Sequence, residues 1–263
     1  MEVIICADAD VVARTATGRI VGALAKRPQP VLGLATGSSP LRIYDQLAAL
    51  NRAGRIDLSG TRAFALDEYV GLPPSHPQSY AETIRTTVTV PCGMNPDLVH
   101  VPDGMATDIE AACQRYEDEI VAAGGIDVQI LGIGSNGHIG FNEPTSSLQS
   151  RTRIKTLTAR TRQDNERFFS HDVKVPTHCV TQGLGTIMDA RRLVLVATGT
   201  KKADAIAAAV EGPVTSMCPA SVMQFHRNAV VVVDEAAASK LTFDGYYRDI
   251  FEHLPEWQQV PGL

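Results

Sequence analysis

Residues 31–40 read VLGLATGSSP, and this stretch decides the fold class. The apolar run Val31–Ala35 predicts a strand that is buried on both faces. Ser39 and Pro40 are typical of the N-cap and the first position of a helix. A buried strand that leads directly into a helix is the building unit of a parallel α/β sheet, so we expect the rest of the chain to repeat it.

The same unit recurs along the chain. Four more apolar runs predict buried strands, and they cover Ala63–Leu66, Val128–Ile133, Leu193–Ala197 and Ala229–Val233. The helical patterns cover Val11–Lys26 with Asp10 as its N-cap, Pro40–Ala53, Ile109–Ala123, Arg160–Phe169, Lys201–Glu211 and the tail after Lys240. The sequence therefore predicts a single α/β domain over residues 1–263, with a mostly parallel, Rossmann-like sheet and helices on both faces. Such sheets bind ligands beyond the carboxyl ends of their strands.

Composition excludes several classes of protein. The chain has 263 residues, 44% of them hydrophobic, and a formal net charge of −5, which disfavours a nucleic-acid-binding protein. The longest apolar run, Ala205–Val210, is too short to span a membrane, and no signal peptide is visible. The five cysteines form no C-x-x-C pair, so we expect reduced thiols and a cytoplasmic protein. No H-E-x-x-H or Cys/His cluster predicts a metal site.

The turn after the first predicted strand is a candidate phosphate site. Thr36, Gly37, Ser38 and Ser39 lie between the strand and a helix, where backbone N–H groups and the helix N-terminus favour an anion. A Walker A loop and a G-x-G-x-x-G motif are both absent here. The alternative interpretation is a tight turn with an N-cap, and the residues alone do not separate the two.

Two acidic residues, Asp67 and Glu68, follow the second predicted strand. A carboxylate at that edge can act as a general base if burial raises its pKa. A helix cap or a surface turn is the alternative. Adjacent acids usually point in different directions, so at most one of the two is expected to be the base.

A glycine-rich loop, residues 132–144 (GIGSNGHIGFNEP), follows the third predicted strand. It contains His138, with Glu143 five residues further on. A carboxylate orients an imidazole and makes it more basic, which suits proton transfer near neutral pH. A single histidine is more often structural, but its place in this loop favours a functional role.

Basic residues are concentrated after this loop, at Arg151, Arg153, Lys155, Arg160, Arg162, Arg167, Lys201 and Lys202. Most are expected to be solvated, and one or two are enough to bind a phosphate. The residues by themselves therefore indicate an α/β enzyme that performs acid–base chemistry on a small phosphorylated compound, without an evident metal or cofactor.

The chain also resembles the glucosamine-6-phosphate deaminase family. The resemblance is carried by LGLATGSSP (32–40), LDEYVGLPPSHPQSY (66–80), LGIGSNGHIGFNEPTSSLQSRTRIKTLT (131–158), RQDNERFF (162–169) and AVEGPV (209–214). GHIGFNEP and SRTRIKTLT are specific to that family, whereas related isomerases and lactonases share only the fold and a Gly-His pair.

The resemblance implies that D-glucosamine 6-phosphate and water give D-fructose 6-phosphate and ammonia, in N-acetylglucosamine catabolism and without a cofactor. It assigns ring opening to His138, oriented by Glu143 with Asn136 nearby, and proton transfer from C2 to C1 to Asp67. Some family members have Asp in place of Asn136, and because an amide cannot share the proton transfer, the pair of His138 and Glu143 would have to carry it.

The resemblance also implies where the substrate phosphate binds, and an assembly. The phosphate would lie on Thr36–Ser39, with Arg167 and Lys202 as cationic partners. Related enzymes form hexamers activated by N-acetylglucosamine 6-phosphate between subunits, and the matching residues are Ser146, Arg153, Lys155 and Tyr247. These residues are compatible with a homo-oligomer and an allosteric site. The alternative is that Arg153 and Lys155 only form ion pairs at a subunit contact.

Two other functions compete with the deaminase. A 6-phosphogluconolactonase has the same fold but needs no carbon base such as Asp67. A non-catalytic sugar-phosphate sensor would carry a helix-turn-helix and lack the acid–base residues, and here Asp67, His138 and Glu143 are all present.

Overall fold

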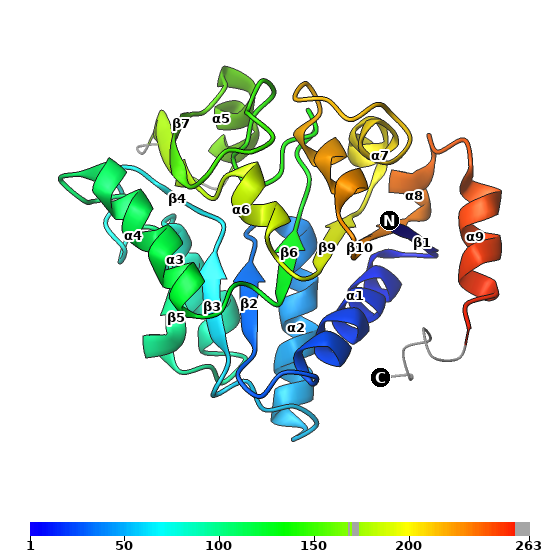
Figure 1. Cartoon of the computed structure of the whole chain (residues 1–263), viewed down its shortest axis with the longest axis horizontal. Helices are drawn as coiled ribbons and strands as arrows, with labels where there is room; N and C mark the ends of the chain where they lie inside the picture. The colour runs from blue at the N-terminus through cyan, green and yellow to red at the C-terminus, as the bar shows by residue number, and fades with distance from the viewer. Residues whose placement is uncertain (168, 170–173, 256–263) are drawn as a thin grey trace.

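The computed structural model describes residues 1–167, 169 and 174–255 (Figure 1). A seven-stranded parallel sheet runs through its centre in the order β1-β10-β9-β6-β2-β3-β5. These strands are β1 (Glu2–Cys6), β2 (Val31–Leu34), β3 (Arg62–Ala65), β5 (Val99–His100), β6 (Val128–Leu131), β9 (Leu193–Ala197) and β10 (Ala229–Asp234). The predicted α/β class with a mostly parallel sheet is confirmed.

Helices surround this sheet (Figure 1). They are α1 (Ala9–Leu24), α2 (Ser38–Arg52), α3 (Tyr80–Ile84), α4 (Ile109–Ala122), α5 (Ala159–Glu166), α6 (Leu184–Met188), α7 (Ala203–Val210), α8 (Glu235–Ala238) and α9 (Asp244–Glu252). None of the helices in the described part of the chain has both the length and the apolar character that crossing a membrane requires.

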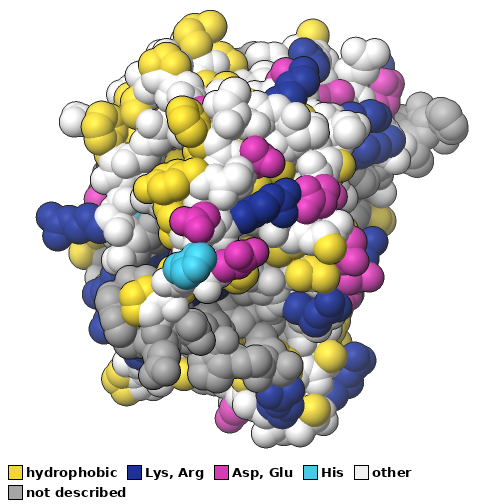
Figure 2. Space-filling model, turned by 90° about the vertical axis from the view of Figure 1, so that its right-hand side faces the viewer, with side chains coloured by type: hydrophobic (Ala, Val, Ile, Leu, Met, Phe, Trp, Pro, Cys, Tyr) yellow, Lys and Arg dark blue, Asp and Glu magenta, His cyan; other side chains and the backbone are white. Residues whose placement is uncertain are grey.

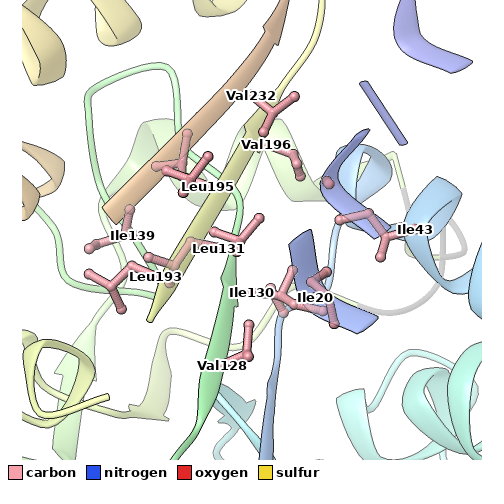
Figure 3. Packing of buried hydrophobic residues seen from close by; sticks show 14 of the residues in the cluster. Ile20, Ile43, Val128, Ile130, Leu131, Ile139, Leu193, Leu195, Val196 and Val232 are labelled. Atoms are coloured by element: carbon pink, nitrogen blue, oxygen red, sulfur yellow. The ribbon is translucent and has the colours of Figure 1, made fainter. Parts of the chain in front are cut away.

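The core lies on the central strands (Figure 3). Val128, Ile130, Leu193 and Val196 are completely buried, as are Ile20 and Ile43 from the helices α1 and α2. Strands covered on both faces need uninterrupted apolar runs, which is why the five runs seen in the sequence became β2, β3, β6, β9 and β10. Ile139 of the glycine-rich loop is also completely buried in this core, so the core holds that loop in place.

A second sheet was not predicted. It is antiparallel, in the order β4-β8-β7, and consists of β4 (Asp67–Tyr69), β8 (His178–Thr181) and β7 (Arg153–Thr156). Its strands have three or four residues, and β7 alternates between half-buried and exposed positions. Such short segments give no continuous apolar signal, and β1 and β5 at the edges of the large sheet were missed as well.

Two helix starts differ from the prediction. Asp8 and not Asp10 caps α1, because its Oδ1 accepts the N–H groups of Asp10 and Val11, both at 2.9 Å. Gly37 and not Ser39 is the N-cap of α2. Gly37 has a φ of 110°, which a residue with a side chain rarely adopts, so glycine is favoured where the chain turns from β2 into α2.

Two other predicted helices begin or end differently. The predicted helix at Arg160–Phe169 is α5, which ends at Glu166 with Arg167 as its C-cap, and Phe168 lies outside the described residues. The predicted helix at Lys201–Glu211 begins as a 3-10 turn, Thr200–Lys202, before α7.

The predicted tail helix is α9, which packs against β1 at the edge of the large sheet. The face of the molecule that carries α9 shows hydrophobic side chains among charged ones (Figure 2). Tyr246, Ile250 and Phe251 of this helix are 62%, 39% and 40% exposed. This helix therefore presents an apolar surface that the described chain leaves uncovered.

Candidate active site

The candidate residues gather at the carboxyl ends of the central strands. The turn Thr36–Ser39 follows β2, Asp67 follows β3, the loop 132–144 follows β6, and Lys202 follows β9. These four strands are neighbours in the order β9-β6-β2-β3. The site therefore occupies the edge of the sheet where parallel α/β folds bind ligands.

Asp67 is a buried carboxyl group beside the glycine-rich loop. It begins β4, pairs with Thr181 of β8, and is 5% exposed. Burial, followed by the charge of Glu68, raises the pKa of Asp67 to about 8. A Cβ atom at Gly140 would lie 3.6 Å from Asp67 Oδ2 and 2.9 Å from Thr181 Oγ1. Gly140 therefore lets the backbone of the loop approach this carboxyl group closely.

Glu68 has a different role. Its Oε1 accepts the backbone N–H groups of Tyr69 at 2.8 Å and Tyr80 at 2.9 Å, and its Oε2 accepts that of Ala81 at 2.8 Å. Burial raises the pKa of Glu68, and these backbone hydrogen bonds oppose the shift. Glu68 thus anchors the start of α3, and Asp67 is the acid of this pair that is left for chemistry.

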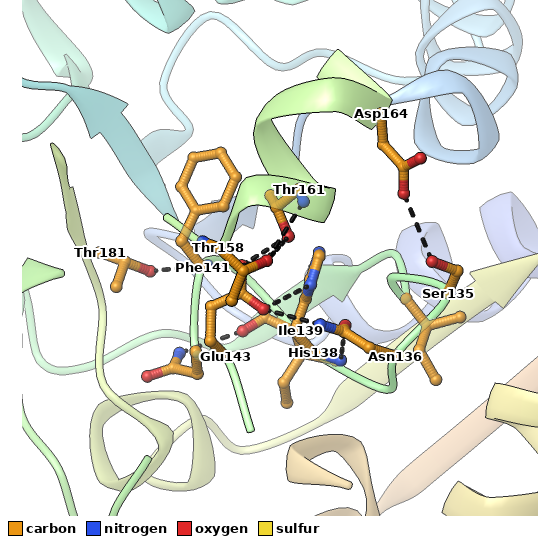
Figure 4. Close-up of polar contacts among 12 residues, drawn as sticks. Ser135, Asn136, His138, Ile139, Phe141, Glu143, Thr158, Thr161, Asp164 and Thr181 are labelled. Carbon is orange, nitrogen blue, oxygen red and sulfur yellow. Dashed lines mark hydrogen bonds and ion pairs between the residues drawn. The ribbon is translucent and has the colours of Figure 1, made fainter. Parts of the chain in front are cut away.

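His138 and Glu143 meet within the loop (Figure 4). His138 Nδ1 lies 3.6 Å from Glu143 Oε2, an ion-pair distance, and Asn136 Nδ2 donates to the same oxygen at 2.7 Å. Asn136 Oδ1 also accepts the backbone N–H of His138 at 3.3 Å. Asn136 therefore holds both members of the pair, and Nε2 is the ring atom that faces away from Glu143.

Glu143 also receives hydrogen bonds from the start of α5. Its Oε1 accepts the hydroxyl group of Thr161 at 2.5 Å and that of Thr158 at 3.2 Å. Burial alone would raise the pKa of Glu143, but His138, Thr161 and Asn136 outweigh it and lower the pKa to about 2. The side chain is 3% exposed and is nevertheless a stable carboxylate. Neither threonine was predicted from the sequence: Thr158 is the last residue of SRTRIKTLT, and Thr161 lies three residues beyond that stretch.

The turn after β2 and the segment after β9 carry predicted phosphate residues. Ser39 Oγ is 3.5 Å from Thr198 Oγ1, which links the turn after β2 to the segment after β9. Lys202 Nζ donates to the carbonyl oxygen of Ile133 at 2.5 Å. Burial lowers the pKa of Lys202; the charge of Asp164 opposes this and that of Arg167 adds to it. The charges of Arg167 and Lys202 therefore interact in the folded protein.

The four residues matched to the allosteric site are not all neighbours within one chain. Arg153 donates to Asn142 Oδ1 at 2.8 Å, Lys155 lies two residues along on β7, and Ser146 is buried in the loop before that strand. Tyr247 lies on α9, where its hydroxyl group donates to Glu211 Oε1 at 3.2 Å. Because α9 packs on β1 and β7 belongs to the other sheet, Tyr247 is separated from the other three.

All five cysteines are buried and unpaired. No group of three or more His, Cys, Asp or Glu side chains in the described part of the chain is arranged to hold a metal ion.

Similarity to known proteins places the chain in a family. A family model described as glucosamine-6-phosphate isomerases/6-phosphogluconolactonase matches residues 7–232. The chain is 62% identical over 248 residues to a glucosamine-6-phosphate deaminase of Cutibacterium acnes, covering 94% of this chain and 95% of that one. It is 56% identical over 258 residues to one of an Arthrobacter species, covering 98% and 99% of the two chains.

Solved structures give the same result. A monomeric glucosamine-6-phosphate deaminase superposes with a TM-score of 0.89 at 37% identity, covering 91% of this chain and 100% of that one. The 6-phosphogluconolactonase from Trypanosoma cruzi, at 19% identity and a TM-score of 0.70 over 92% and 97% of the two chains, shares the fold. The resemblance seen in the sequence is confirmed: this chain belongs to the glucosamine-6-phosphate isomerase/6-phosphogluconolactonase family.

Proposed function

We propose that this protein is an isomerising deaminase that converts D-glucosamine 6-phosphate and water to D-fructose 6-phosphate and ammonia. The observation that carries the proposal is a buried carboxyl group, Asp67, that lies against Gly140 of the loop that holds the His138–Glu143 pair. A lactonase has no need of a base for carbon, whereas an aldose–ketose isomerisation requires one.

Asp67 would take the proton from C2 and return it to C1. A pKa of about 8 makes both of its protonation states accessible near neutral pH, which a group that accepts and then releases a proton requires. One base can serve both carbons because they are adjacent in a planar intermediate. Water then hydrolyses the resulting imine at C2, which leaves the ketone and releases ammonia.

His138 would assist the opening of the sugar ring. Glu143 is ionised and its Oε2 lies 3.6 Å from Nδ1, so it would orient the ring. Nε2 is then the atom available to move a proton on the substrate. Asn136, which donates to Glu143, would position the pair without taking part in proton transfer.

The substrate phosphate would bind to the turn Thr36–Ser39, with Arg167 and Lys202 as its cations. The interacting charges of these two residues and the contact between Ser39 and Thr198 support this placement. Because the groups of the site come from segments spread between Thr36 and Lys202, we propose that the chain works as one domain.

We also propose a cytoplasmic role in amino-sugar catabolism, because phosphorylated sugars do not cross membranes unaided. A homo-oligomer would cover the apolar side chains of α9 and could bring Tyr247 of one copy near Arg153 and Lys155 of another. That assembly would complete a site for N-acetylglucosamine 6-phosphate. Because one solved relative is described as monomeric, the oligomeric state has to be measured directly.

The test is the release of ammonia and fructose 6-phosphate from glucosamine 6-phosphate, with and without N-acetylglucosamine 6-phosphate. We expect equal amounts of both products, and stimulation by the acetylated compound if the second site works. Hydrolysis of 6-phosphogluconolactone without release of ammonia would show a lactonase instead. Binding of the sugar phosphate without turnover of either compound would show a sensor.

A further inference from the structure

The two carboxylate oxygens of Glu143 contact two different parts of the site. Oε2 faces the catalytic loop, where it interacts with Asn136 and His138. Oε1 faces the start of α5, where it accepts the hydroxyl groups of Thr158 and Thr161 and, at 3.3 Å, the backbone N–H of Thr158. The orientation of the carboxylate toward His138 is thus fixed from the side opposite the histidine.

The threonines are themselves arranged to hold this oxygen. Thr158 is the N-cap of α5 and accepts the backbone N–H of Thr161 at 3.2 Å, and the two hydroxyl groups are 3.0 Å apart. Thr161 is 3% exposed, so water does not readily replace its hydroxyl group at Glu143. Without that donor, a buried carboxylate oxygen would lose its shortest hydrogen bond.

Helix α5 connects this contact to the proposed phosphate site. Ser135 of the catalytic loop donates to Asp164 of α5 at 3.3 Å (Figure 4), and Asn165 donates to the hydroxyl group of Tyr69 at 3.1 Å. Arg167 is the C-cap of the same helix. One helix of eight residues therefore contacts Glu143 at its start and carries a proposed phosphate ligand at its end.

We propose that Thr161, assisted by Thr158, is a positioning residue that fixes the Glu143 carboxylate against His138 and makes that orientation depend on the placement of helix α5. The inference rests on the proposed function for the role of His138. Phosphate bound at Arg167 would hold α5 in place and thereby keep the histidine oriented for ring opening.

The decisive comparison is between Thr161→Val, which removes the hydroxyl group at nearly constant volume, and Thr161→Ser, which keeps it. We expect Thr161→Val to lower kcat about 10-fold with KM changed less than about 2-fold, because the hydroxyl group orients an acid–base pair and does not touch the substrate. Thr161→Ser should restore most of the rate. Thr186→Val is the matched control, because Thr186 donates to another buried carboxylate, Glu117, at 2.6 Å. It should leave kcat unchanged.

A second readout does not need turnover. The titration of the Glu143 carboxyl carbon can be followed by NMR in protein labelled at its glutamate side chains. Among the described residues, the titratable groups that interact with Glu143 include His138 and the thiol of Cys179, whose pKa burial raises and the charges of Asp67 and Glu143 raise further. Both are present in every variant, so a rise in the Glu143 midpoint in Thr161→Val alone would report the lost hydroxyl group.

The outcomes separate the two proposals. An unchanged kcat and an unchanged Glu143 midpoint in Thr161→Val would overturn the positioning role. A loss in Thr161→Ser equal to that in Thr161→Val would also overturn it, because the effect would then come from the methyl group. Absence of deaminase activity in the unsubstituted enzyme would remove the proposed function, while the NMR comparison would still decide whether Thr161 holds Glu143.

Discussion

Two buried glutamates of this protein have nearly the same surroundings and different uses. Glu117 on α4 is 7% exposed and accepts the backbone N–H of Thr152 at 2.8 Å and the hydroxyl group of Thr186 at 2.6 Å. Glu143 in the catalytic loop is 3% exposed and also accepts two threonine hydroxyl groups. Burial would raise the pKa of each, and the hydrogen bonds lower both instead.

The difference lies in the cation. Arg151 donates to Glu117 Oε2 through Nε at 3.0 Å and Nη2 at 2.5 Å, and a guanidinium group keeps its proton in proteins. His138 faces Glu143, and an imidazole can gain and lose a proton near neutral pH. Threonine hydroxyl groups therefore support an ion pair with arginine at Glu117 and, at Glu143, the histidine pair that we propose for acid–base chemistry.

Replacing Asp67 should have the largest effect, and it adds a third buried carboxyl group to the comparison. Asp67→Asn should lower turnover roughly 10,000-fold, since a general base contributes up to about that factor.

Asp67→Asn should also stabilise the fold at pH 8. The folded state raises the pKa of Asp67 from 3.8 to about 8. Between these two pH values the unfolded chain loses this proton and the folded protein keeps it, so the free energy of unfolding falls as the pH rises. The cost removed at pH 8 is at most about 6 kcal/mol. Calorimetry and product assays on the same sample measure both effects, and a lower Tm than wild type at pH 8 would contradict the assignment.

The contribution of Glu143 to the free energy of unfolding should change with pH in the opposite direction to that of Asp67. The folded state lowers the pKa of Glu143 from 4.5 to about 2, so the unfolded chain binds this proton more tightly. The stabilisation is complete above pH 4.5 and disappears as the pH falls toward 2, a loss of about 3 kcal/mol. Glu143→Gln should remove that share of the pH dependence. Urea unfolding at pH 6 and pH 3 measures it, and an unchanged difference between the two pH values would argue against an ionised Glu143.

Exchanging each glutamate for glutamine tests the comparison directly. Glu143→Gln should lower kcat on the order of 100-fold, because the amide can no longer hold His138 through an ion pair. Glu117→Gln should leave kcat within about 2-fold and lower the free energy of unfolding by about 1–3 kcal/mol. Steady-state kinetics and urea unfolding of both variants give the answer. A large loss of kcat in Glu117→Gln would show that the two carboxylates are not separate in function.

Changing only the cation of the structural pair should have the smallest effect. Arg151→Lys keeps the charge but loses the pair of hydrogen bonds from Nε and Nη2 to Glu117, and the hydrogen bond to Asp189 at 2.6 Å. Arg151 is 48% exposed, so we expect a loss of only about 1 kcal/mol in the free energy of unfolding and no change in kcat. The same unfolding measurement applies. A loss in the free energy of unfolding as large as that of Glu117→Gln would mean that the stabilisation by this pair depends on the geometry of its hydrogen bonds and not on its charge.

The central sheet could be predicted because its strands are buried on both faces. Continuous apolar runs identified β2, β3, β6, β9 and β10 within a few residues. The small sheet β4-β8-β7 could not be predicted, because its strands are short and one of them alternates between half-buried and exposed positions. The start of α2 at Gly37 depends on a positive φ that a general preference for serine as an N-cap does not reveal.

The site was predictable in part for a similar reason. Asp67 and His138 directly follow strands, and the carboxyl ends of parallel strands meet at one edge. The choice between Asp67 and Glu68 needed the structure, since only the hydrogen bonds to Tyr80 and Ala81 show that Glu68 is used to anchor a helix. Thr158 and Thr161 were missed because they are 15 and 18 residues from Glu143.

The sequence by itself determined the α/β class, the position of the catalytic loop after a buried strand, and the resemblance to the deaminase family. These depend on local patterns, in which neighbouring residues carry the whole signal. Only the tertiary structure decided which acid is free for chemistry, which hydroxyl groups hold Glu143, and that Tyr247 is separated from Arg153 within one chain. Those outcomes depend on burial and on contacts between distant segments, because the pKa of a carboxyl group is set by the groups that folding brings around it.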